Sequence, residues 1–169
     1  MRNKCLENEY RSFQKLCTFH EPQKIRLLEK QGQPPDFDRL EISNCKGIEA
    51  VSDDVVRYRT EHILTISHFP SNYLVPGVLP ILKIEPPIFH PNIYYNGSID
   101  LYLYCRQLFT QRLDTLVTIV ISIIQYENLN FRLPANSQAK DWANKNKHLF
   151  PLRSSSDVSN PSKPKLNWR

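Results

Sequence analysis

Residues 90–105, HPNIYYNGSIDLYLYC, place several side chains that could take part in catalysis close together in the sequence. Cys105 offers a thiol, whose ionised form is a strong nucleophile for thioester chemistry. Asp100 offers a carboxylate that could act as a base toward an attacking amine. No second catalytic group lies near Asp100 in the sequence, so a solvated or hydrogen-bonded loop carboxylate is the favoured interpretation. Cys105 can also be interpreted as a small, partly buried apolar residue.

Four tyrosines surround Asp100 in the same stretch. Aromatic side chains with a polar tip are common anchors in binding surfaces, but they are also ordinary residues of a sheet. The sequence favours neither interpretation. The candidate binding residues of this cluster are Tyr94, Tyr95, Tyr102 and Tyr104.

The cysteines do not indicate a metal or redox site. Cys5, Cys17, Cys45 and Cys105 are scattered, without C-x-x-C spacing or a nearby paired histidine. We therefore expect reduced thiols in a cytoplasmic protein, with a nuclear location as the alternative, and neither a metal nor a cofactor.

Length and composition favour one soluble domain. The chain has 169 residues, of which 40% are hydrophobic, enough to bury an apolar core without disulfides. No segment has the apolar length of a signal peptide or a membrane span. The net charge of +5 is modest and unclustered outside the C-terminal tail, so solvated surface charge is favoured over nucleic-acid binding. Asn96-Gly97-Ser98 is expected to form a turn.

The elements that must position these residues follow from periodicity. Apolar residues at three- and four-residue spacings predict helices over 3–17 and 113–127, and Asn136 is the candidate N-cap of a further helix that begins after Pro134 and continues to Phe150. Pro151 ends this helix. The predicted fold class is α+β, with one domain over 1–151 and a disordered, basic, Ser- and Pro-rich tail over 152–169.

Between the first two helices the sequence predicts a four-stranded antiparallel meander. Turn residues separate the runs, and residues 52–54 are one such turn. Alternation in the third run predicts one half-buried strand with Tyr58, Thr60, His62, Leu64 and Ile66 on the same face. The four predicted runs are 24–31, 37–50, 55–69 and 79–87.

Four motifs, in order and with suitable spacing, resemble the ubiquitin-conjugating enzyme family. They are FPSNYLVPGVLPILKI at 69–84, HPNI at 90–93, NGSI at 96–99 and LPANSQAKDW at 133–142. The resemblance covers roughly residues 3–150 and implies the UBC-like fold: an N-terminal helix, a four-stranded antiparallel meander, an active-site-like loop and two C-terminal helices. In this family the first of these segments helps to form a partner-binding surface. The resemblance therefore adds Phe69, Pro70 and Tyr73 as candidate binding residues.

The chain departs from the family at the reacting atom. The family's thioester-forming cysteine lies ten residues after the motif histidine, and that position here is Asp100. A carboxylate cannot replace a thiolate in transthiolation, because the reaction needs a soft nucleophile that is also a good leaving group. Cys105 lies five residues further on, about 16 Å away at full extension. It could serve only if the whole loop differs from that of the family.

The other motif residues change their expected roles accordingly. The family's motif asparagine is linked to stabilising the oxyanion that forms when a lysine attacks the thioester. Without a thioester, Asn92 is better interpreted as a residue whose hydrogen bonds hold the loop. His90 is likewise expected to be structural rather than a base.

Three functions remain open. The leading hypothesis resembles the catalytically inactive ubiquitin-conjugating-enzyme variants, which hold ubiquitin or an active conjugating enzyme non-covalently; the expected partners are a ubiquitin-like protein, an active conjugating enzyme or both. The second is a divergent conjugating enzyme with Cys105 as nucleophile. The third is a stand-alone structural or scaffold protein outside these pathways, because a resemblance in fold does not settle function. Leu74 and Gly77-Val78 also depart from the family's proline pattern, so recognition of the family's usual ligase partners is not expected.

Overall fold

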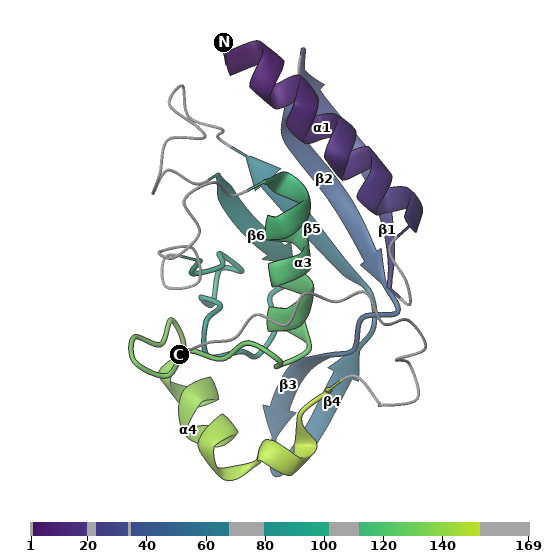
Figure 1. Cartoon of the computed structure of the whole chain (residues 1–169). Coiled ribbons are helices and arrows are strands. Elements are labelled where there is room, and N and C mark those ends of the chain that lie inside the picture. Colours follow the sequence, from purple (N-terminus) through teal and green to yellow (C-terminus); the bar gives the residue numbers. More distant parts are fainter. Residues whose placement is uncertain (1, 20–22, 34, 68–79, 102–111, 153–169) are drawn as a thin grey trace.

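The computed structural model of the chain contains an N-terminal helix, a four-stranded antiparallel sheet, a separate β-hairpin and two C-terminal helices (Figure 1). The protein is therefore of the α+β class, as predicted. The structure describes residues 2–19, 23–33, 35–67, 80–101 and 112–152. The predicted tail lies outside this part of the chain, apart from Leu152.

The main sheet has the strand order β1-β2-β5-β6, with every neighbouring pair antiparallel. Its buried face follows from alternation in the sequence, since Leu40, Leu64 and Ile84 lie side by side across three strands and are fully buried. The strands are β1 (Lys24–Gly32), β2 (Pro35–Ser43), β5 (His62–Ser67) and β6 (Ile81–Glu85).

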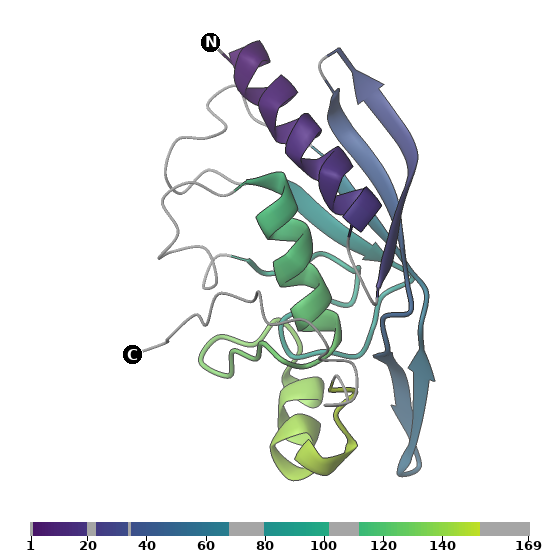
Figure 2. The same cartoon turned by 45° about the vertical axis from the view of Figure 1, so that its right-hand side comes forward.

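Two of the predicted strands were too long. The second run divides into β2 and β3 (Gly47–Ser52), and the third divides into β4 (Val55–Arg59) and β5. The chain bends at Asn44, which adopts a left-handed φ of 57°, and the Cys45 N–H bonds the Thr60 carbonyl at 3.0 Å. The strands β3 and β4 then pair as a separate antiparallel hairpin below the sheet (Figure 2). The predicted turn is formed by Asp53 and Asp54, whereas Ser52 is the last residue of β3.

The division also corrects the predicted face of the third run. His62, Leu64 and Ile66 are buried on one face of β5, as predicted. Tyr58 belongs instead to β4, and Thr60 is an exposed residue between the two strands. A single alternating pattern therefore crosses from one sheet into the other, because a period of two continues through a bend that the sequence does not mark.

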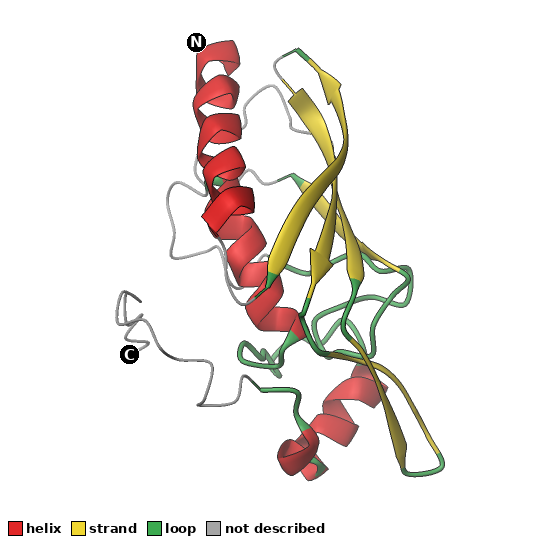
Figure 3. Ribbon diagram, turned by 90° about the vertical axis from the view of Figure 1, so that its right-hand side faces the viewer, coloured by secondary structure: helices red, strands yellow, loops and turns green. Residues whose placement is uncertain are grey.

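Two helices cover one face of the main sheet (Figure 3). They are α1 (Arg2–Phe19), which buries Phe13, and α3 (Leu113–Ile124), whose apolar residues recur at helical spacing. The helix α3 begins where predicted but ends three residues early, because Tyr126 turns the chain with a left-handed φ of 59°. Asp114 lies in its first turn, where the helix dipole favours a negative charge.

The helix α4 (Ser137–Lys145) begins at the predicted cap. The Asn136 side chain accepts a hydrogen bond from the Ala139 N–H at 3.0 Å. The helix ends at Lys145 rather than at Phe150, and a short 3₁₀ turn, η1 (Lys147–Leu149), follows. The helix α4 packs with the β3-β4 hairpin around a second, smaller core that contains Ile48, Tyr126 and Ala143.

Candidate functional site

The motif histidine is buried in the structure rather than presented to solvent. His90 is fully buried, and its Nδ1 accepts a hydrogen bond from the Asn92 N–H at 3.0 Å. The neutral ring then carries its proton on Nε2, which has no hydrogen-bond partner among the described residues. The ring packs edge-on against Tyr126, with centroids 4.6 Å apart. Burial lowers the pKa of His90 to about 3, so the imidazole is neutral at physiological pH.

The side-chain amide of Asn92 joins two distant segments. Its Nδ2 donates to the Asn130 carbonyl at 2.8 Å, and its Oδ1 accepts from the Asn130 N–H at 2.9 Å. Asn92 is only 1% exposed, whereas its partner Asn130 is half-buried, so the two bonds are partly shielded from water. These are hydrogen bonds that hold the loop, as the structural interpretation of Asn92 expects.

A tight turn after the motif fixes the loop against β6. The Gly97 N–H donates to the Tyr94 carbonyl at 2.8 Å, and the Gly97 carbonyl accepts from the Ile84 N–H at 2.9 Å. Gly97 has a φ of +87°, and a Cβ there would lie 2.2 Å from the Ile84 carbonyl oxygen. Glycine is therefore required by both conformation and space. The predicted turn at Asn96-Gly97-Ser98 is confirmed.

Asp100 lies against the motif asparagine. Its backbone N–H donates to the Asn92 carbonyl at 3.0 Å, its side chain is half-buried, and the next residue, Leu101, is buried. The tenth residue after His90 is therefore held in place by the motif loop. The chemistry available at this held position is that of a carboxylate.

The structure describes only part of the predicted binding cluster. Tyr94 and Tyr95 are 46% and 67% exposed, and the Tyr95 hydroxyl donates to Gln138 Oε1 on α4 at 3.4 Å. The turn thus exposes two aromatic side chains, of which Tyr95 lies beside the start of α4. The candidates Phe69, Pro70, Tyr73, Tyr102, Tyr104 and Cys105 lie outside the described residues.

Two residues of this site were missed by sequence reasoning. Asn130 completes the pair with Asn92, and Tyr126 packs on His90 while its hydroxyl donates to the Phe89 carbonyl. Neither lies in a recognisable motif. The only local sign is that both follow the end of a strongly apolar helix, where a loop must return to the core.

The Cys17 thiol is not activated. Cys17 is half-buried and Cys45 is buried, and neither forms a disulfide within the described part of the chain. Burial, followed by the charge of Asp38, raises the pKa of Cys17 to about 11, so its thiolate is scarce at neutral pH. The side chain of Cys5 is outside the described part of the structure.

Comparison with known protein families returns no match: no family model matches this chain. Within the described residues, no cluster of three or more His, Cys, Asp and Glu side chains could hold a metal ion. The helices of this part of the chain lack the combined length and apolar character that crossing a membrane requires.

Proposed function

We propose that this chain is a catalytically inactive UBC-like module that binds a ubiquitin-like protein or an active conjugating enzyme non-covalently. The observation that carries the proposal is Asp100, a carboxylate at the tenth position after His90, held against Asn92 through its backbone. The α+β arrangement of one N-terminal helix, a four-stranded antiparallel sheet and C-terminal helices is compatible with the UBC-like fold.

The hydrogen bonds of the motif support a structural role for the loop. A catalytic amide must direct a donor toward the oxyanion of the reacting group. The amide of Asn92 pairs with the backbone of Asn130 through one N–H of Nδ2 and through Oδ1, and these two bonds orient it toward that segment. The buried, neutral His90 ring also accepts a hydrogen bond from the loop, from the Asn92 N–H. The motif therefore maintains a surface next to Asp100 without supplying a nucleophile there.

An assay for thioester formation, driven by an activating enzyme, tests the proposal. The purified chain is incubated with an activating enzyme, ATP and a ubiquitin-like protein, and a non-reducing gel is examined for an adduct that disappears with thiol reductant. We expect no adduct under conditions in which an active conjugating enzyme is charged. A reducible adduct that is lost in Cys105→Ser but retained in Cys17→Ser would overturn the proposal and assign the chain as an enzyme with a displaced nucleophile.

A binding experiment tests the remaining half of the proposal. The isotopically labelled chain is titrated with ubiquitin-like proteins and with active conjugating enzymes, and amide chemical shifts are followed by NMR. We expect saturable shifts with at least one of them. Binding should be weaker for Tyr94→Ala and Tyr95→Ala than for the control Val55→Ala, which removes an exposed apolar side chain on β4, outside the candidate binding cluster. Absence of binding to every member of both classes would leave the scaffold alternative.

A further inference from the structure

A carboxylate lies on the covered face of the main sheet, among apolar neighbours. Asp38, Leu40 and Ile42 occupy alternate positions of β2, so their side chains project from the same face, which the two helices cover (Figure 3). The antiparallel partner of Asp38 on β5 is the buried Ile66. Asp38 itself is only 1% exposed. An ionisable group is therefore buried where the sheet packs against helices.

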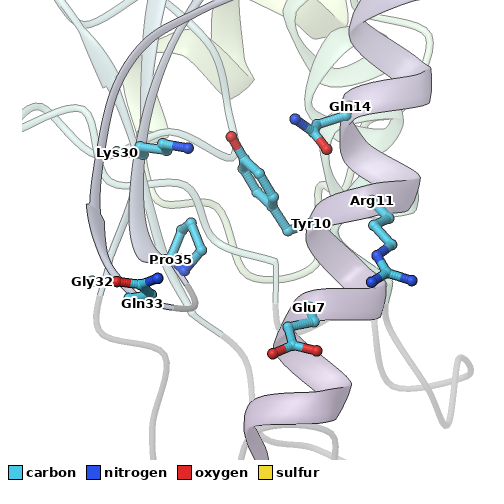
Figure 4. Close-up of a pocket in the computed structure, with 8 residues that line it drawn as sticks. All are labelled: Glu7, Tyr10, Arg11, Gln14, Lys30, Gly32, Gln33 and Pro35. Atoms are coloured by element: carbon cyan, nitrogen blue, oxygen red, sulfur yellow. The ribbon is translucent and has the colours of Figure 1, made fainter.

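The helix nearest to Asp38 is α1. Lys30, the antiparallel partner of Asp38 on β1, contacts this helix, with its Nζ 5.1 Å from the centroid of the Tyr10 ring (Figure 4). The charge of Asp38 also acts on the Cys17 thiol. Tyr10 and Cys17 are about two helical turns apart and share one face of α1. Asp38 therefore lies under the middle of α1, and departure of this helix would bring water to the carboxylate.

The burial of this carboxylate is poorly compensated. Its Oδ1 has no hydrogen-bond partner among the described residues. The ammonium of Lys30 lies on the Tyr10 ring instead. An ionised carboxylate that is buried without a donor costs more free energy than a protonated one. Burial accordingly raises the pKa of Asp38 to about 6, although the charge of Lys30 lowers it.

The charged and titratable side chains around Asp38 come from β1, β2 and α1, and β5 contributes the apolar Ile66. They are Lys30, Asp36, Tyr10 and Cys17. Lys30 favours the ionised carboxylate and Asp36 opposes it, and burial outweighs both effects. The α1 residue Glu9, which accepts the first N–H of α3 and lies near Asp114, is a second carboxylate whose pKa burial raises. Its ionisation acts on α1 in the same direction, so an experiment must separate the two.

We propose that α1 is a pH-sensitive cover of the main sheet, and that ionisation of Asp38 weakens the docking of this helix. In mild acid the neutral carboxyl group is tolerated beneath α1. At neutral pH the carboxylate increases the population in which α1 has left the sheet and water reaches Asp38. Opening also removes Phe13 from the core and the Glu9 carboxylate from the start of α3. This inference does not depend on the proposed function, since it uses none of the motif residues.

The response of α1 to pH differs in sign from that of global unfolding. Departure of α1 exposes Asp38 but leaves His62 on β5 and His90 in the motif loop buried. Because the pKa of Asp38 is about 6 when covered and 3.8 when exposed, the opening constant of α1 should rise about tenfold between pH 5 and pH 7.5. Global unfolding also releases the two histidines, whose pKa values burial lowers, so its equilibrium constant should fall over the same range.

Amide hydrogen exchange of the full chain, followed by NMR at pH 5 and pH 7.5, tests the proposal. Exchange rates corrected for the intrinsic chemical rate give an opening constant for each amide. We expect the constants of Phe13 and Leu16 in α1 to rise about tenfold with pH, and those of Leu40 and Leu64 in the central strands to fall. Constants for α1 that stay level, or that fall together with those of the sheet, would overturn the proposal.

Variants assign the response to one carboxylate. Asp38→Asn keeps the shape of the side chain without its charge, and the rise in the α1 opening constant should disappear. Glu9→Gln should keep most of the rise, and Asp54→Asn, at an exposed turn, should keep all of it. A full rise in Asp38→Asn, or its loss in Glu9→Gln, would contradict the assignment. The carbon-13 shift of the Asp38 carboxyl in the natural chain is an independent measurement: its midpoint should lie at about pH 6, and a midpoint at the ordinary value of 3.8 would also overturn the proposal.

Discussion

The Asn92 side chain makes two hydrogen bonds that hold the motif loop in place. It bonds the backbone of Asn130, which lies 38 residues further along the chain, through both amide atoms. A short amide side chain can replace one edge of a β-ladder in this way, because it offers one donor and one acceptor at backbone-like spacing. The loop and the segment after α3 therefore behave as one unit at this point.

Removal of this amide should destabilise the fold. We expect Asn92→Ala to lower the free energy of unfolding by roughly 2 to 4 kcal/mol, because the Asn130 N–H and carbonyl lose their partners in a partly shielded place. Urea unfolding followed by Trp142 fluorescence measures the effect. The control is Asn144→Ala on the exposed side of α4, for which we expect little change. If Asn92→Ala were as stable as this control, the loop-holding role would be wrong.

At the scale of elements, α1 and α3 are joined at the point where α3 begins. The residue before α3, Arg112, makes no side-chain cap. The Glu9 carboxylate of α1 instead accepts the Leu113 N–H at 2.7 Å. One helix thus supplies the cap of another, and the negative charge also lies at the favourable end of the α3 dipole. Docking of α1 and formation of α3 are therefore coupled.

We expect Glu9→Ala to lower the free energy of unfolding by about 1 to 2 kcal/mol, as for the loss of an N-cap. Glu9→Gln should recover part of this, because its amide oxygen can still accept the bond but carries no charge. Glu7→Ala, an exposed residue two positions earlier, is the control. Denaturant unfolding curves of the three variants decide the matter, and equal losses for Glu7→Ala and Glu9→Ala would exclude a capping role.

At the scale of the whole molecule, the buried ionisable groups change the stability of the fold in opposite directions as the pH falls. Burial lowers the pKa of His62 from 6.5 to about 4, although its Nε2 bonds the Cys45 carbonyl at 2.8 Å. The unfolded chain therefore binds this proton at a higher pH than the folded one, and stability is lost as the pH falls from about 6.5 to about 4. His90 acts in the same direction, over a window that extends to about pH 3.

Asp38 changes the stability of the fold in the direction opposite to the two histidines. Burial raises its pKa from 3.8 to about 6, so the folded chain binds this proton first, and stability is gained as the pH falls from about 6 to 3.8. We expect Asp38→Asn to lose roughly 2 to 3 kcal/mol more stability than the natural chain between pH 7 and pH 4. Denaturant unfolding at several pH values measures the difference. Asp54→Asn, at an exposed turn, should follow the natural chain, and identical pH profiles for all three would contradict the expectation.

Much of the fold could be predicted from local pattern. Helical spacing located α3 and its buried face, alternation located the buried residues of β5, and an asparagine after a proline located the cap of α4. Glycine at position 97 indicated the turn. Each of these features depends on side chains a few residues apart, where steric and hydrogen-bonding preferences act directly on the backbone.

The ends and breaks of elements were less predictable. The sequence did not mark the bend at Asn44 or the left-handed Tyr126, and both are non-glycine residues held in an uncommon conformation. Such a conformation persists only where surrounding contacts stabilise it, as the ring packing of Tyr126 on His90 does here. The helix predicted to reach Phe150 was also too long. Phe150 packs against the second core, so the apolar pattern continues beyond Lys145 although the helix ends there.

The sequence by itself determined the class of fold, the apolar faces, the main turns and the presence of a carboxylate ten residues after His90, because these depend on composition and short-range spacing. Only the tertiary structure decided how the motif is used. The pairing of Asn92 with Asn130, the cap from Glu9 to Leu113 and the placement of Asp38 opposite Lys30 join residues that are separated in the chain. No local preference specifies such contacts, because they form only when packing of the sheet and helices brings the groups together and removes them from water.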